Sequence, residues 1–67
     1  MITESEKNEI LSRLMALRSS TEQRIADLER LYQTSEDDDE KYYADEARVY
    51  LIIAFENIVL SIKELLG

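Results

Sequence analysis

The first half of the chain repeats its apolar positions at the spacing of an α-helix. From Ile10 to Tyr32 the intervals are 4, 3, 4, 4, 3 and 4 residues, with a single threonine among apolar side chains: Ile10, Leu14, Leu17, Thr21, Ile25, Leu28 and Tyr32. These intervals place all seven positions on one face of a helix. Thr3 and Glu6 have the spacing of a capping box, so the sequence predicts a helix over residues 3 to 33.

The stretch "RSST" at residues 18 to 21 raises an alternative in which this helix breaks in two. Ser19 stands three residues before Glu22, which is the spacing of another capping box. Ser20 and Gln23 have the same spacing. The apolar spacing continues unchanged across the serines, which favours one continuous helix.

A run without apolar side chains, "QTSEDDDEK" at residues 33 to 41, separates this helix from a second apolar segment. No proline occurs in the chain, and its only glycine is Gly67, so nothing else interrupts the two segments. Ser35 is the expected N-cap of a second helix, because Asp38 follows it by three residues.

The sequence therefore predicts an all-α fold in a single domain, residues 1–67. We expect an antiparallel hairpin of two long helices, with an acidic turn at residues 34–36 and a second helix over residues 36–66. A chain this short buries little of its own surface, and it has no cysteine with which to form a disulfide. Very regular helix packing, oligomerisation, or both are expected to stabilise it.

The second helix is apolar nearly all round, and one partner helix cannot cover it. Val49, Ile53 and Leu60 share a sector of the helical wheel with the charged Glu56 and Lys63. We expect the hairpins to self-associate, with a homodimeric four-helix bundle as the favoured form. Larger rings, a bound ligand or an unrelated protein are the alternatives. The residues expected between the subunits are Val49, Ile52, Ile53, Phe55, Val59 and Leu60.

The net charge of −7 is concentrated in one segment, because residues 36–46 carry seven acidic side chains and one lysine, a net charge of −6. A helix N-terminus attracts carboxylates, but this many neighbouring carboxylates repel one another. The excess indicates a basic protein surface as the partner. The expected contact residues are Asp37, Asp38, Asp39, Glu40 and Tyr42. Tyr43 is expected either beside them or packed against the first helix near Tyr32.

The position of the acidic residues also predicts how the two subunits are oriented in the dimer. Two acidic turns side by side would repel, so we expect the two subunits to pack antiparallel, with their turns at opposite ends. Along the helices, Glu9 precedes Arg13 by four residues and Asp45 precedes Arg48 by three. Both spacings predict ion pairs on the helix surface.

The chain has neither histidine nor cysteine, so the usual nitrogen and sulfur ligands of zinc are missing, and its serines and lysines show no arrangement that would activate a nucleophile. We therefore expect a non-enzyme without a cofactor. An EF-hand loop beginning at Asp37 would need glycine and glutamate where Tyr42 and Arg48 stand. Glu36 with Asp39 or Glu40 leaves one alternative, a magnesium site in an enzyme like the all-α nucleotide pyrophosphatases.

The sequence favours a small acidic regulator or inhibitor that works by protein–protein binding, of the kind that bacteria and phages encode. Its polar, acidic beginning is unlike a signal peptide, so a cytoplasmic location is expected. Charged residues interrupt the apolar segment, so we expect no membrane association. The acidity argues against direct nucleic-acid binding, and the alternative is an acidic mimic that inhibits a DNA- or RNA-binding protein.

Overall fold

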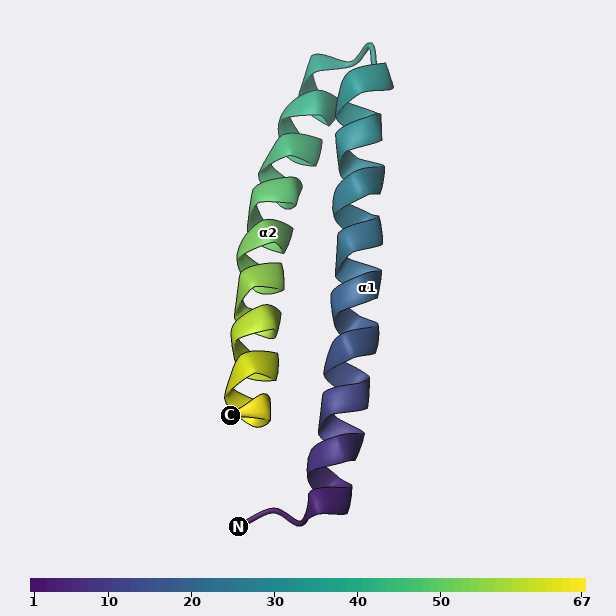
Figure 1. Cartoon of the computed structure of the whole chain (residues 1–67). Helices are drawn as coiled ribbons and strands as arrows, with labels where there is room; N and C mark the ends of the chain where they lie inside the picture. Colours follow the sequence, from purple (N-terminus) through teal and green to yellow (C-terminus); the bar gives the residue numbers. More distant parts are fainter.

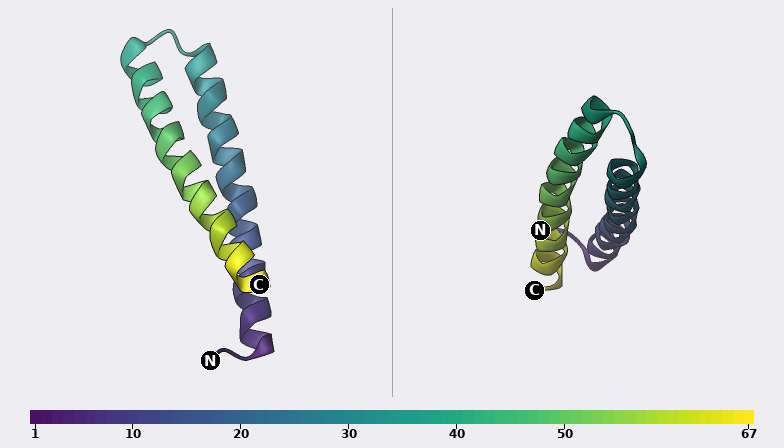
Figure 2. Two further views of the ribbon diagram at one scale, coloured as in Figure 1. Left: turned by 60° about the vertical axis from the view of Figure 1, so that its left-hand side comes forward. Right: turned by 90° about the horizontal axis from the view of Figure 1, so that it is seen from above.

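The chain forms two long helices joined by a short turn in the computed structural model, which describes all residues from 1 to 67 (Figure 1). Helix α1 spans Glu4–Thr34 and helix α2 spans Asp38–Leu66. They run antiparallel and cross at a small angle, forming a rod of 51 × 15 × 13 Å (Figure 2). The predicted all-α antiparallel hairpin is confirmed.

Helix α1 begins with the predicted capping box. The Thr3 hydroxyl oxygen accepts a hydrogen bond from the Glu6 backbone N–H at 3.1 Å, and the Glu6 carboxylate accepts one from the Thr3 N–H at 3.3 Å. The reciprocal bonds satisfy two donors that would otherwise lack a partner at the helix end. The first turns of α1 project beyond the C-terminal end of α2 (Figure 1).

Helix α1 is continuous through the serine-rich stretch, so the alternative of a break at residues 18 to 21 is wrong. The Thr21 hydroxyl donates to the Leu17 carbonyl oxygen at 2.8 Å within the helix. This bond satisfies the hydroxyl without leaving the helical backbone, which lets Thr21 be buried at the contact with α2.

The turn lies slightly later in the chain than the sequence predicts. Ser35 is the C-cap of α1, not the N-cap of α2, and residues 35–37 form the turn. The N-cap of α2 is Asp37, whose Oδ1 accepts hydrogen bonds from the N–H groups of Asp39 at 2.9 Å and Glu40 at 3.4 Å. A charged oxygen serving two amides at the positive end of the helix is the stronger cap.

The contact between the helices is a thin seam with only three buried residues, Thr21, Ala44 and Ile62. Ala44 and Ile62 are 18 residues apart, about five helical turns, so both face α1. One seam of this kind leaves much of the apolar surface of the chain uncovered.

Helix α2 carries seven of the fourteen exposed large apolar side chains, and α1 carries five. The apolar sequence of α2 is nevertheless interrupted by charged residues such as Glu56 and Lys63. Neither helix reaches the combination of length and apolar character that crossing a membrane requires.

Candidate protein-interaction surface

The side of α2 that faces away from α1 carries a row of exposed apolar side chains. Ile53 lies nine residues from both Ala44 and Ile62, which at about 100° per residue is half a turn from the side that faces α1. We call this row the outer stripe of α2. Its members, with their exposed fractions, are Tyr42 at 63%, Val49 at 45%, Ile53 at 51% and Leu60 at 55%.

The structure places the six residues predicted for the subunit interface in two groups. Val49, Ile53 and Leu60 belong to the outer stripe and are exposed. Ile52, Phe55 and Val59 are half-buried. Phe55 stands seven residues before Ile62, on the side of α2 that faces α1, so part of its ring is covered within the hairpin.

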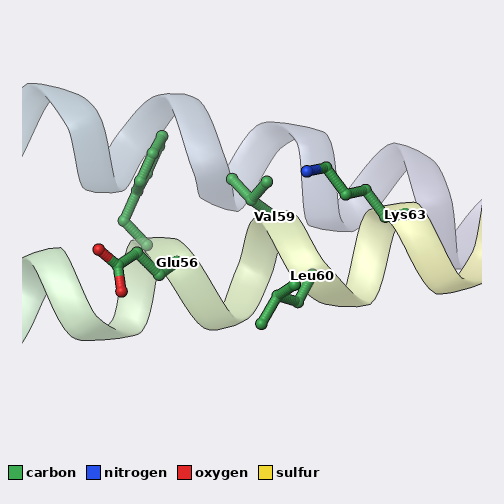
Figure 3. Close-up of a pocket in the computed structure, with 5 residues that line it drawn as sticks. Glu56, Val59, Leu60 and Lys63 are labelled. Carbon is green, nitrogen blue, oxygen red and sulfur yellow. The ribbon is translucent and has the colours of Figure 1, made fainter.

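A shallow groove of about 330 Å³ lies next to the outer stripe (Figure 3). In Figure 3, Glu56 and Lys63 lie at its two ends and Leu60 projects away from α1. The residues that line it are Phe55, Glu56, Val59, Leu60 and Lys63. The groove therefore offers an apolar floor between two charged side chains, a suitable seat for an aliphatic side chain.

The charged residues next to the outer stripe have no ion-pair partner within the chain. Glu46, Glu56 and Lys63 are exposed, and none of the three ion pairs in the structure includes them. Lys63 lies in the last turn of α2, where the helix dipole favours a cation. These charges are free to pair with groups from another molecule.

The ion pairs that do form lie along single helices. Both predicted pairs are confirmed: Arg13 Nη2 lies 2.7 Å from Glu9 Oε1, and Arg48 Nη2 lies 2.9 Å from Asp45 Oδ1. The hydrogen bond with Asp45 raises the pKa of the Arg48 guanidinium, which stays protonated in any case. A third pair joins Asp27 and Arg30 at 3.6 Å.

The acidic turn is exposed and unneutralised. Asp38, Asp39 and Glu40 are exposed, form no ion pair and occupy the first turn of α2, while Asp37 is used as its cap. The nearby Lys41 points back toward α1, with its Nζ 5.8 Å from the centre of the Tyr32 ring. No three carboxylates gather as metal ligands would. The carboxylates of the first turn therefore face solvent.

Two adjacent tyrosines lie next to the acidic turn. The rings of Tyr42 and Tyr43 meet edge to face, with their centres 5.2 Å apart. Tyr43 is 67% exposed, so its predicted packing against the first helix is wrong. It is Ala44, one residue later, that faces α1, and a neighbouring residue on a helix points about 100° away.

Sequence reasoning missed some of the exposed apolar residues. On α1, Ile10, Leu17 and Leu31 are 40%, 50% and 38% exposed. They share a face of α1 because multiples of seven residues separate them, a signal that is present in the sequence. On α2, Tyr50 is 66% exposed beside the outer stripe.

Comparison of the chain with protein-family models, with curated protein sequences and with solved structures found no match.

Proposed function

We propose that the protein is a small, acidic, non-enzymatic interaction protein, a regulator or inhibitor that self-associates and binds another protein. One observation carries this proposal: α2 exposes the outer stripe on a side that no part of the chain covers, in a rod with three buried residues. Apolar rows of this kind in small helical scaffolds are usually completed by another helix. Two hairpins joined through α2 would supply the four helices of the predicted dimer.

The acidic turn is the proposed contact with a basic surface of the second protein. Capping accounts for Asp37, but not for Asp38, Asp39 and Glu40, which are exposed and lack a cation. Tyr42 stands beside them and is 63% exposed. A rigid aromatic side chain next to charged groups is typical of a protein-binding hot spot. An antiparallel dimer would present one such turn at each end.

The other functional alternatives stay predictions. A nucleic-acid mimic needs negative charge along a face, whereas the acidic segment here is gathered at the end of the rod that holds the turn (Figure 1). No observation favours the magnesium-dependent enzyme over the binding protein. The cytoplasmic location and the bacterial or phage origin also stay predictions.

The acidic contact is tested by capturing partners from a native cell lysate with the tagged protein. Changing Asp37, Asp38 and Asp39 to asparagine removes three charges, while asparagine at residue 37 preserves the cap. We expect this variant to lose a partner that the natural chain retains. If the partner is retained, the contact lies elsewhere on the helices.

A matched control removes the same number of charges away from the turn. Glutamine replaces the exposed carboxylates of Glu4, Glu9 and Glu22 on α1. We expect this control to keep the partner. Equal loss in both variants would show that net charge, and not the acidic turn, governs the binding.

A further inference from the structure

We propose that a second copy of this chain covers the outer stripe, antiparallel and in one register, with Val49 against the partner's Leu60 and Glu46 against the partner's Lys63. The inference rests on the self-association proposed above and specifies its geometry. It is argued from the spacing of the outer stripe, from the free charges beside it and from the groove at its C-terminal half.

The outer stripe has the spacing of a coiled-coil seam. Together with the three free charges beside it, it occupies positions separated alternately by four and three residues: Tyr42, Glu46, Val49, Ile53, Glu56, Leu60 and Lys63. This heptad spacing keeps one face of α2 turned toward a single partner helix. Because this face mixes apolar and charged side chains, the possible registers differ in how favourable their contacts are.

Repulsion between like charges disfavours a parallel arrangement of the two α2 helices. In a parallel pair in register, each of Glu46, Glu56 and Lys63 would meet its own copy, which repels. The acidic turns would also meet at one end of the dimer. An antiparallel pair avoids both, because the charges on the two sides of the aliphatic residues of the outer stripe have opposite sign: Glu46 stands before Val49 and Lys63 follows Leu60.

One antiparallel register pairs these charges. It places Glu46 against the partner's Lys63 and Val49 against the partner's Leu60, and two-fold symmetry repeats each contact. On one flank, Ile52 meets the partner's Val59. Ile53 meets the partner's Glu56, so this register also carries the cost of one carboxylate per subunit against an apolar side chain, but no carboxylate faces another. The proposed contacts use five of the six residues predicted for the subunit interface.

The neighbouring registers are poorer. A shift of seven residues in one direction gives two kinds of apolar pair, Val49 with the partner's Ile53 and Tyr42 with the partner's Leu60, and it pairs Lys63 with the partner's Asp39. This register also places Glu46 against the partner's Glu56 at two symmetric places between the subunits. The two carboxylates repel, and the favourable pairs must offset that repulsion. A shift in the other direction leaves Ile53 against the partner's Lys63 and removes the apolar pairs.

The groove supports the same register. Val49 of one subunit would lie over the partner's Leu60, next to the groove of about 330 Å³ that Leu60 helps to line. Glu46 stands one helical turn before Val49, which brings its carboxylate to the end of the groove where Lys63 lies (Figure 3). An aliphatic side chain and a carboxylate one turn apart thus fit a largely apolar groove whose lining includes the ammonium group of Lys63.

The register is tested by disulfide cross-linking, for which the chain is suited because it has no cysteine. Single-cysteine chains V49C and L60C are mixed and oxidised. We expect the mixture to yield a disulfide-linked dimer of one chain of each kind, because disulfides need Cα atoms within about 7 Å. V49C alone should not cross-link, since the two copies of residue 49 would be separated by 11 residues, about 16 Å along the helix.

Other cross-linking patterns would overturn the register. A dimer from V49C alone would indicate a parallel pair, and one from V49C mixed with I53C would indicate the shifted antiparallel register. Either result leaves the proposed function standing, because the chain would still self-associate. A natural chain that is monomeric, or that is covered only by another protein, would contradict the self-association and the register together.

Charge reversal tests the pairing of Glu46 with Lys63 independently. We expect E46K or K63E alone to raise the dissociation constant of the dimer on the order of tenfold, because each affects two symmetric pairs. The double variant E46K/K63E should return it to within about threefold of the natural value. E22K, which makes the same change of charge on α1, is the control and should have no such effect; an equal effect of E22K and E46K, or no rescue, would contradict the pairing.

Discussion

Replacing Ile62 with alanine is expected to lower the free energy of unfolding by about 3 kcal/mol and to leave much of the chain unfolded at room temperature. Ile62 is 5% exposed and is the only large apolar side chain among the three buried residues. Removing an isoleucine side chain from a packed site costs about 2 to 5 kcal/mol, and a small helical scaffold has about 3 to 5 kcal/mol to lose. Circular dichroism during urea unfolding measures the change.

A control for Ile62 removes an apolar side chain from the surface. Met15 is 38% exposed on α1 and stands six residues before the buried Thr21, about 120° around the helix from the seam, so its replacement by alanine should cost no more than about 1 kcal/mol. If the two variants lost equal stability, the seam between α1 and α2 would not be what holds the hairpin together.

Replacing Leu60 with glutamate is expected to separate the subunits while the hairpin stays helical. Leu60 is 55% exposed in the single hairpin, so a charge there meets water. In the dimer the same charge would face the partner's Val49 at two symmetric places without a cation, and a buried, unpaired charge is strongly unfavourable. We expect the dissociation constant to rise by about 100-fold or more.

Sedimentation equilibrium gives that constant, and circular dichroism checks the helix content of the same sample. The matched control is Met15→Glu, which places the same charge on an exposed apolar residue of α1. Dimerisation that survives Leu60→Glu, or that is lost equally in both variants, would mean that the outer stripe is not the contact between subunits.

The helices were predictable because apolar residues recur along the sequence at the spacing of an α-helix. The apolar positions of α1 keep one phase from Ile10 to Tyr32, and no glycine or proline interrupts either helix. The exact turn was less predictable. Ser35 and Asp37 are both residue types that cap helices well. Only the structure shows that the carboxylate of Asp37 accepts the hydrogen bonds from the amides of the first turn.

The candidate surface was predictable in part. Val49, Ile53 and Leu60 stand out in the sequence because they share a sector with charged residues. The sequence does not show which side of α2 faces α1, because α2 is apolar nearly all round. The side that faces α1 depends on how closely the two backbones approach. The structure buries Ala44 and Ile62 against α1, and this orientation leaves Phe55 half-buried and Tyr43 exposed.

The central claim is that α2 of one chain is covered by α2 of another, and the mass of the natural protein in solution tests it most directly. Light scattering coupled to size-exclusion chromatography, at concentrations from micromolar upward, should return twice the chain mass of 7.8 kDa. A stable mass of one chain over that whole range would contradict the account.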